Sequence, residues 1–328
     1  MTGHSSPAAD EAVVTVDAVE KSFGTIRAVD RISFAVHGGE MFGVIGPDGA
    51  GKTTLLRLIC GLLRADRGEI RVLGANPFRE RRAAAGAIGY LSQRFSLYGD
   101  LSIDENIEFF ARIHGVRDFR AGRDRLLGLT GLTKFRTRYA DKLSGGMKQK
   151  LALACTLIHQ PPILVLDEPT TGVDPVSRRE FWKLLAEFRN QGLTILLATP
   201  YLDEAERCQR VALVARGQVL ALDRPAVLQA AGRGVLLEVL VSPARAALDV
   251  ARRHAGADRV QLFGERLHVK ADEAADGAAL EQALGAAGLE VEGWRVIPPS
   301  LEDVYIDRLA ALRPDGAAPV EVEKEQSS

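Results

Sequence analysis

Gly46-Pro47-Asp48-Gly49-Ala50-Gly51-Lys52-Thr53-Thr54 decides the fold, because it fits the pattern G-x-x-x-x-G-K-[ST]. The apolar run Met41–Ile45 precedes it and is typical of a buried strand, and an amphipathic helical pattern begins near Lys52. Successive backbone N–H groups in such a loop face one point at a helix N-terminus, and that point attracts anions. The stretch therefore predicts that the chain binds a nucleoside triphosphate.

Each part of this loop has a predicted role. The glycines let the backbone approach the β- and γ-phosphates, Lys52 supplies a point charge, and the Thr53 hydroxyl is a ligand for Mg²⁺. The predicted phosphate-binding residues are Gly46, Pro47, Asp48, Gly49, Ala50, Gly51, Lys52, Thr53 and Thr54.

A second apolar strand, residues 163–166, ends in the adjacent carboxylates Asp167 and Glu168. A buried strand end is a costly place for two charges unless something uses them. Mg²⁺ and an attacking water would use them: Asp167 would hold the metal, mostly through water, and Glu168 would polarise the water or accept its proton. The alternative is a solvated pair of carboxylates at a strand end.

A third element is the run Leu143-Ser144-Gly145-Gly146-Met147-Lys148-Gln149, which opens a helix that extends to about Ile158. Ser144 is placed as its N-cap, so a second anion-binding helix start is expected. Two glycines here cost the helix about 1 kcal/mol each relative to Ala. Our interpretation is that close approach to a ligand requires Gly145 and Gly146, and a flexible helix start is the alternative.

Composition restricts the class of protein. The 328 residues favour one large and one small domain. With 42 Lys and Arg against 43 Asp and Glu, the near-zero net charge does not suggest nucleic-acid binding. The isolated Cys60, Cys155 and Cys208 indicate reduced, buried thiols of a cytoplasmic protein. No apolar stretch reaches the roughly 18 residues of a membrane span, so we expect another chain to do any membrane work.

The domain boundaries follow from the patterning. Residues 1–10 and 314–328 are polar and are expected to be disordered tails. Residues 11–224 alternate strand and helix patterns, which predicts an α/β domain whose largely parallel central sheet contains the runs 13–16, 31–36, 163–166, 193–198 and 211–214.

Residues 225–313 are expected to form a small α+β domain. A strand at 235–241 precedes a helix with Ser242 as N-cap and Pro243 at its first position. A hairpin (259–263 and 266–270), a helix ending near Gly288 and a strand at 289–296 follow. The order βαββαβ is that of a ferredoxin-like module, and a last helix is expected at 301–312.

The phosphate loop, the Leu-Ser-Gly-Gly run and the Asp-Glu strand, in this order and spacing, resemble the ATP-binding subunit of an ABC transporter. Phe23 lies where the family has its adenine-stacking aromatic residue, Gln93 where it has the Q-loop glutamine, and Asp174 where it has the D-loop aspartate. The resemblance covers residues 13–223. It implies a P-loop ATPase cassette with a mostly parallel sheet, an antiparallel edge and a helical subdomain that carries the signature run.

The resemblance also implies how the site is completed. ATP and Mg²⁺ would be the ligands, with Thr53, Gln93 and Asp167 at the metal. Two chains would form a head-to-tail dimer, in which each ATP lies between the phosphate loop of one and Ser144, Gly145 and Gly146 of the other. Gln149 belongs to the same signature run and is assigned to ATP binding with it. The partner would be a second copy of this chain or a different ATPase chain.

Residues 89–107 and residues 299–305 (PSLEDVY) look like bacterial ABC-2 type exporters of the multidrug or antibiotic-resistance kind. These pair a separate ATPase with a separate membrane permease, so the resemblance places this chain in the cytoplasm, peripherally on the inner face of the plasma membrane. Phe95, Leu97 and Tyr98 follow Gln93 in a loop where the family receives the permease, and core burial is the alternative. The exported substrate would contact the permease.

One position departs from the family. After the strand at residues 193–198 the family has a histidine that contacts the γ-phosphate, and this chain has Pro200, which offers no donor. Three outcomes are open: a slow homodimer, pairing with a chain that carries the histidine, or ATP binding without useful hydrolysis. Retention of Glu168 argues against the last. A soluble ABC ATPase outside transport is the rival class, but it usually has two cassettes or a coiled-coil insertion, and neither is present.

Overall fold

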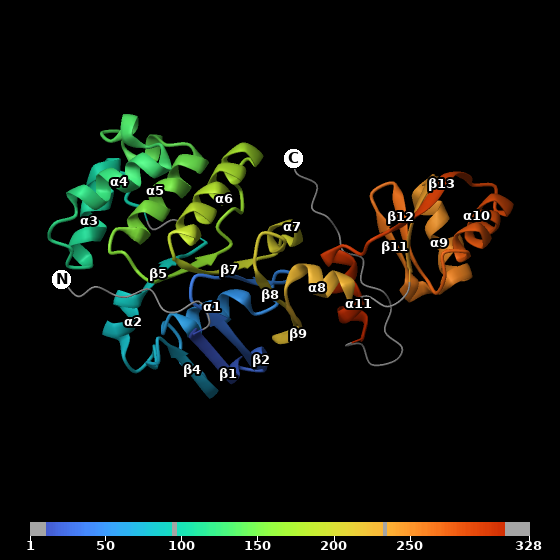
Figure 1. The fold of residues 1–328 in the computed structure, drawn as a ribbon, viewed down its shortest axis with the longest axis horizontal. Coiled ribbons are helices and arrows are strands. Elements are labelled where there is room, and N and C mark those ends of the chain that lie inside the picture. The colour runs from blue at the N-terminus through green and yellow to red at the C-terminus, as the bar shows by residue number, and fades with distance from the viewer. Residues whose placement is uncertain (1–10, 94–96, 232–234, 312–328) are drawn as a thin grey trace. The chain divides into compact units, whose positions relative to one another are not determined.

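The computed structural model describes residues 11–93, 97–231 and 235–311 of the chain. The chain divides into two compact units, with the boundary between Pro225 and Ala226 (Figure 1). The expected tails at 1–10 and 314–328 lie outside the described residues, and so does Phe95. No helix in the described ranges combines the length and the apolar character that crossing a membrane requires.

Unit 1 is built on a six-stranded sheet with the strand order β5-β6-β7-β3-β8-β9. All neighbours pair in parallel except β8 and β9, which are antiparallel at one edge. A parallel sheet covered on both faces needs strands that are apolar throughout, and every residue of β3, β6 and β7 is buried. The strands are β5 (Ile88–Leu91), β6 (Ile163–Asp167), β7 (Thr194–Thr199), β3 (Met41–Ile45), β8 (Arg210–Ala215) and β9 (Gln218–Asp223).

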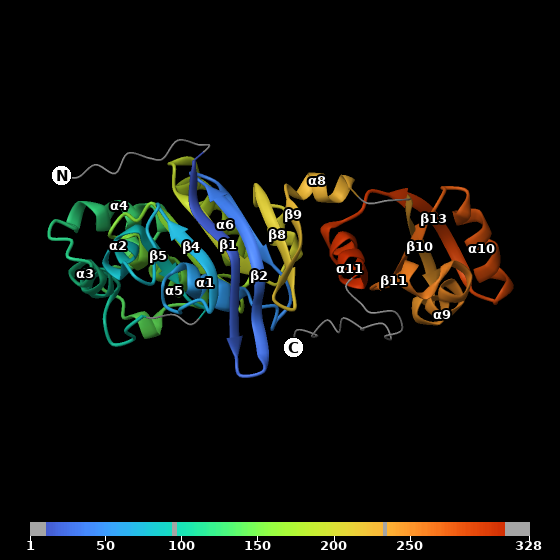
Figure 2. The same ribbon diagram turned by 90° about the horizontal axis from the view of Figure 1, so that it is seen from below.

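A separate antiparallel sheet of three strands has the order β2-β1-β4, from β1 (Ala12–Phe23), β2 (Ile26–His37) and β4 (Arg67–Val72). The prediction that residues 13–16 and 31–36 belong to the central parallel sheet was therefore wrong. Only Gly24 and Thr25 separate β1 from β2, and a connection this short joins antiparallel strands (Figure 2). Apolar side chains of α1 (Lys52–Ile59) share one core with residues of both sheets.

Helices of unit 1 gather beside the central sheet as a helical subdomain, with α5 against α3, α4 and α6 (Figure 1). Ser102 and Glu105 form a capping box that starts α3. The other helices of unit 1, which are α2, α7, α8, η1 and η2, have seven residues or fewer. The bounds are α2 (Arg81–Ala87), α3 (Ile103–Ile113), α4 (Arg120–Thr130), η1 (Thr133–Phe135), η2 (Ala140–Lys142), α5 (Gly145–Leu157), α6 (Pro175–Asn190), α7 (Leu202–Ala205) and α8 (Pro225–Ala230), which crosses the boundary between the units.

Unit 2 has the predicted order of elements, and its sheet order is β11-β12-β10-β13 with antiparallel neighbours throughout. Ser242 is not the N-cap of the next helix as predicted: it pairs with Glu290 as the last residue of β10, and Pro243 is the N-cap. The bounds are β10 (Val235–Ser242), α9 (Ala244–Ala255), η3 (Ala257–Arg259), β11 (Val260–Phe263), β12 (Arg266–Ala271), α10 (Asp276–Ala286), β13 (Glu290–Ile297) and α11 (Leu301–Ala311).

The two faces of the unit 2 sheet differ. One face carries Leu267 and Val269 of β12, which share an apolar core with α9 and α10. Alternation along the strand places His268 and Lys270 on the other face, where they contact Asp303 and Asp307 of α11. These polar contacts join α11 to the sheet, and Leu301 and Val304 of the same helix are buried.

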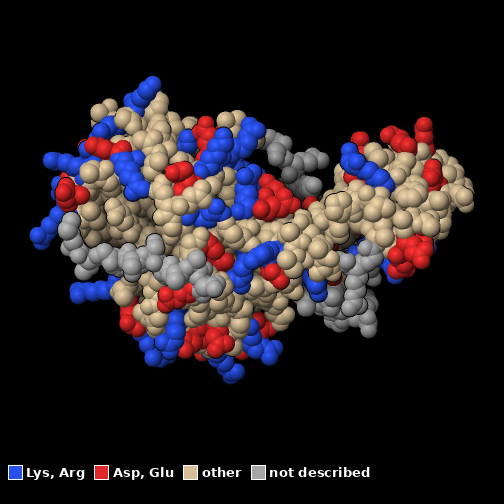
Figure 3. Space-filling view, viewed as in Figure 1, with Lys and Arg blue, Asp and Glu red and all other residues tan. Residues whose placement is uncertain are grey.

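Charged side chains of both signs are interspersed on the face of the molecule seen in Figure 3. This distribution agrees with the nearly equal numbers of basic and acidic residues. That the protein binds no nucleic acid stays a prediction.

Candidate nucleotide-binding site

The phosphate loop connects β3 to α1, and close packing requires two of its glycines. A Cβ atom on Gly46 would lie 2.2 Å from the Val214 carbonyl oxygen. Gly51 has φ +98°, and a Cβ atom there would lie 2.1 Å from the Ala28 carbonyl oxygen. Gly49 also has a positive φ but open space around it, so its requirement is conformational. The loop backbone thus packs closely against β8 of the central sheet and β2 of the antiparallel sheet. The first turn of α1 follows directly after the loop.

Lys52 lies at the start of α1 with only 4% of its surface exposed. Its Nζ donates to the Pro47 carbonyl oxygen at 3.0 Å and lies 3.1 Å from Glu168 Oε1. A buried ammonium needs such partners because it has left water. This places the positive charge between the phosphate loop and the carboxylate at the end of β6.

Asp167, which is 1% exposed, is held by two hydroxyl donors. Thr53 Oγ1 donates to Asp167 Oδ1 at 2.9 Å, and the Tyr90 hydroxyl donates to Oδ2 at 3.1 Å. Burial, with the nearby Asp167 charge, raises the pKa of Tyr90, so the phenol stays a donor. A hydroxyl and a carboxylate side by side are hard oxygen donors of the kind that fit Mg²⁺, so Thr53 and Asp167 are the residues that would hold the ion.

Glu168 is fixed from three directions. Its backbone N–H donates to the Ala198 carbonyl oxygen at 2.9 Å, Gln93 Nε2 donates to its Oε2 at 3.0 Å, and Lys52 faces its Oε1. Its φ of +50° lies in the left-handed region, which costs a residue other than glycine about 1–3 kcal/mol and persists only where the surroundings impose it. The carboxylate predicted to act as the base is therefore rigidly aimed.

The signature run opens α5 as predicted: Ser144 is the N-cap and accepts the Met147 N–H at 3.3 Å. The interpretation that a ligand requires both glycines stays a prediction, and the structure gives a second reason for Gly146. A Cβ atom there would lie 2.2 Å from Ser177 Oγ, so packing against α6 already requires glycine, whereas Gly145 has open space. Ser144 and Gly145 are exposed. Among the described residues no hydrogen bond joins them to Lys52 or to the residues around it, Thr53, Asp167 and Glu168.

The remaining site residues have structural contacts of their own. Gln149 is buried and donates through Nε2 to the Pro169 carbonyl oxygen, so it anchors the loop after Glu168. Asp174 is the N-cap of α6 and accepts the N–H groups of Val176 and Ser177 at 3.1 and 3.0 Å. Hydrogen bonding from Ser177 lowers the pKa of Asp174. That either residue binds nucleotide stays a prediction.

The remaining positions that the sequence singled out are Phe23, Pro200, Leu97 and Tyr98. Phe23 ends β1 with half of its surface exposed, as a base-stacking platform would need. Pro200 follows β7 and brings neither an imidazole nor an N–H to this place.

Tyr98 is exposed with its ring 4.4 Å from that of Phe109, and Leu97 is half-buried. For these two residues the structure therefore bears out neither the predicted partner surface nor full burial in the core.

Sequence reasoning missed Tyr90, although the signal was present. In the run Ile88-Gly89-Tyr90-Leu91 it is the one hydroxyl in a buried strand, and a buried tyrosine hydroxyl usually has a hydrogen-bond partner. The partner, Asp167, is 77 residues away along the chain. Neighbouring parallel strands β5 and β6 bring the two together.

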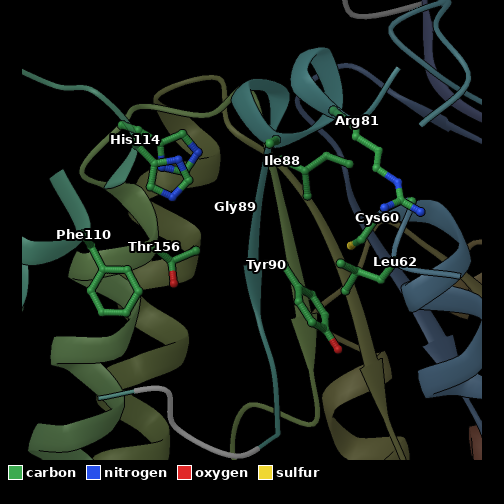
Figure 4. Close-up of a pocket in the computed structure, with 13 residues that line it drawn as sticks. Cys60, Leu62, Arg81, Ile88, Gly89, Tyr90, Phe110, His114 and Thr156 are labelled. Carbon is green, nitrogen blue, oxygen red and sulfur yellow. The ribbon is translucent and has the colours of Figure 1, made fainter. Parts of the chain in front are cut away.

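A cavity of about 400 Å³ lies next to this site, between α2 and β5 on one side and α3 and α5 on the other (Figure 4). The rings of His114 and His159 stack at its wall with centroids 3.8 Å apart. Burial, with His114 nearby, lowers the pKa of His159 to about 4, and burial also lowers the pKa of His114. Both imidazoles are therefore neutral at pH 7.

This burial makes stability depend on pH. In the unfolded chain His159 titrates near its ordinary pKa of 6.5, so between about pH 6.5 and 4 the unfolded state binds a proton that the folded state does not. We expect the free energy of unfolding to fall as the pH drops through this window. Urea titrations of wild type and His159→Phe, which keeps a stacked ring, measure it. An equal pH dependence in both proteins would contradict this assignment.

The comparisons with known proteins agree with this geometry. A family model described as ABC transporter matches residues 29–171. The daunorubicin resistance ATP-binding protein DrrA3 of Streptomyces coeruleorubidus is 36% identical over 304 residues, which cover 90% of this chain and 95% of that protein. The chain belongs to the ABC transporter ATP-binding family. The ABC cassette fold predicted from the phosphate loop, the signature run and the Asp-Glu strand is thereby confirmed.

Two other comparisons extend the family assignment. The probable multidrug ABC transporter ATP-binding protein YbhF of Escherichia coli strain K12 is 44% identical over 234 residues, which are 70% of this chain and 40% of that protein. The chain thus spans less than half the length of this ABC relative. The solved structure of cbiO1 from Clostridium perfringens, part of the ABC transporter complex cbiONQ, gives a TM-score of 0.62 at 26% identity and covers 68% of this chain and 92% of that one.

Proposed function

We propose that this ABC protein is the ATP-binding and ATP-hydrolysing subunit that powers a separate ABC-2 type permease for the export of drugs or other small molecules. The observation that carries the proposal is the contact cluster of Lys52, Thr53, Asp167, Glu168 and Gln93, which joins the phosphate loop to the end of β6 and to the segment after β5. The names of the relatives from Escherichia coli and Streptomyces support the exporter branch.

The geometry supports a mechanism for hydrolysis. The loop N–H groups and Lys52 bind the β- and γ-phosphates at the N-terminus of α1. Thr53 and Asp167, with Gln93 nearby, would hold Mg²⁺, and the ion would supply positive charge to neutralise these phosphates. Glu168 accepts a proton from the attacking water, and the Gln93 amide fixes the orientation of this carboxylate through its Oε2.

A second copy of the cassette, or a different ATPase chain, completes each site. The start of α5 is exposed at Ser144 and Gly145, so this end of the helix is accessible to a nucleotide held by another chain. Two helix N-termini that converge on one γ-phosphate hold the dimer closed, and loss of that phosphate releases it. The exposed Asp174 at the start of α6 joins the same interface.

In this proposal the permease binds the loop after Gln93. Tyr98 is exposed there and Leu97 is half-buried, so the aromatic ring is accessible to a partner. Movement of Gln93 with the state of the γ-phosphate would then be transmitted to the membrane chain. In this arrangement the protein lies in the cytoplasm on the inner face of the plasma membrane.

The experiment is to purify the protein alone and together with an ABC-2 permease encoded beside it, and to measure Mg-ATP hydrolysis in detergent and in proteoliposomes. We expect hydrolysis that depends on Mg²⁺, co-purification with the permease and faster turnover in the complex. Absence of both ATP binding and permease association would overturn the proposal. Co-purification with ribosomes or DNA instead would indicate the soluble class of ABC ATPase.

Pro200 favours a second candidate, a slow half of a heterodimer. Loss of one transition-state donor costs on the order of 10² to 10³ in rate in comparable sites, so we expect Pro200→His to raise kcat by about tenfold or more. Pro200→Ala removes the ring and restores a backbone N–H but adds no imidazole, so it serves as the matched control, with kcat close to wild type. If kcat of Pro200→His does not rise under steady-state conditions, the missing imidazole does not limit turnover.

A further inference from the structure

A fully buried acid, Glu204, lies in α7 just behind the proposed site. Its exposed fraction is 0%, yet its carboxylate accepts four hydrogen bonds. Oε2 accepts from Thr199 Oγ1 at 2.6 Å. Oε1 accepts from Thr170 Oγ1, from Arg178 Nε at 2.8 Å and from Trp182 Nε1 at 3.2 Å.

The four donors come from the segments that frame the site. Thr170 belongs to the short connection between Glu168 and the start of α6, and Arg178 and Trp182 lie on α6 itself. Thr199 ends β7, and its carbonyl oxygen accepts the N–H of Gly46 in the phosphate loop at 3.3 Å. The Glu204 carboxylate therefore joins three segments by hydrogen bonds: the connection after Glu168, the helix α6, and the end of β7 that contacts the phosphate loop.

A second buried side chain holds the neighbouring residue of the same connection. Gln149 of α5 donates to the Pro169 carbonyl oxygen, so Pro169 and Thr170 are each anchored by a buried polar side chain from a different helix. The preceding residue is Glu168 itself, whose left-handed φ requires surroundings that hold the backbone. The two anchors supply this constraint.

Stability alone is a weak reason for such a network. A buried carboxylate loses its hydration, and well-packed apolar residues of similar volume often stabilise a protein as well or better. Directed hydrogen bonds, unlike apolar packing, fix the relative positions of the groups they join. The contribution of Glu204 is therefore to fix the relative positions of the segments that it joins.

We infer that Glu204 is a positioning residue, which holds the connection from Glu168 to Asp174 in register with the phosphate loop so that the base meets the γ-phosphate of bound ATP. This inference rests on the proposed function, since it assigns Glu204 a part in hydrolysis. Glu204 touches none of the reacting groups and acts through Thr170, Arg178 and Thr199. A misplacement of the base by about 1 Å can cost up to 10²-fold in rate.

The test compares the kcat of Mg-ATP hydrolysis with the Kd for a fluorescent ATP analogue, in the full-length protein. Glu204→Gln keeps the shape but removes the charge that accepts from Arg178, and we expect kcat to fall at least about tenfold with Kd changed less than about twofold. Asp203→Asn is the matched control, because exposed Asp203 accepts from the same arginine at 3.0 Å. It should leave both constants close to wild type.

Thr170 provides a second route that does not depend on how well Glu204→Gln folds. Thr170→Val removes the hydroxyl donor and should lower kcat in the same way, whereas Thr170→Ser keeps the donor and should restore it. Equal kcat in wild type, Glu204→Gln and Thr170→Val would overturn the positioning role, and so would a parallel loss of binding and turnover in both variants. A wild-type protein without Mg-ATP binding or hydrolysis would instead overturn the proposed function.

Discussion

Replacing Glu168 by Gln is expected to lower the kcat for Mg-ATP hydrolysis by about 10²- to 10⁴-fold, because an amide cannot accept the proton of the attacking water. The substitution keeps the size of the side chain and one oxygen for the Gln93 contact, so the local structure should persist. Binding of Mg-ATP should remain, since phosphate contacts come from the loop and from Lys52. Steady-state hydrolysis and equilibrium binding measure the two effects separately.

A further expectation for Glu168→Gln concerns the dimer. If hydrolysis is what separates the two chains, the variant should accumulate as a dimer with Mg-ATP in gel filtration while the wild type does not. Glu108→Gln is the control, because Glu108 forms a surface ion pair with Arg112 on α3, away from the site. Hydrolysis by Glu168→Gln at the wild-type rate would assign the base to another residue.

Replacing Lys52 by Ala is expected to raise the Kd for Mg-ATP by about 30-fold or more and to abolish measurable hydrolysis. Loss of one partner from a buried charge contact costs about 2–5 kcal/mol, and each 1.4 kcal/mol is tenfold in affinity. The variant also removes the charge 3.1 Å from Glu168, which leaves this carboxylate with the Gln93 amide.

The control for Lys52→Ala is Lys183→Ala, because Lys183 is an exposed lysine on α6. It should bind and hydrolyse Mg-ATP like wild type. Melting curves of both variants without nucleotide separate lost binding from lost folding. Unchanged affinity in Lys52→Ala would remove the phosphate loop from the proposed mechanism.

Much of the fold could be predicted from local pattern. Strands that are buried on both faces, such as β3, β6 and β7, are mostly apolar, and this signal can be read without knowing which strands are neighbours. The placement of β1 and β2 could not be predicted in the same way. Their runs are equally rich in β-branched residues, and only pairing decides that they leave the central sheet.

The site shows the same division. Lys52, Asp167 and Glu168 stand in motifs whose spacing carries the chemistry, so they were predicted as a set. Gly146 belongs to such a motif too, and the structure adds a physical reason that the motif does not show: packing against Ser177, 31 residues later in the chain. A motif therefore predicts which residue is important but does not predict which neighbouring residue it contacts.

The sequence by itself determined that this protein binds a nucleoside triphosphate, because a phosphate loop is a contiguous stretch whose backbone makes the anion site. Only the tertiary structure decided which groups Tyr90 and Glu204 contact. Tyr90 lies in an apolar strand, whereas Glu204 directly follows the acidic Asp203. The groups they contact come from other segments: Asp167 is 77 residues from Tyr90, and Thr170 is 34 residues from Glu204. The partner of a buried polar atom is a property of packed strands and helices, and no local pattern contains it.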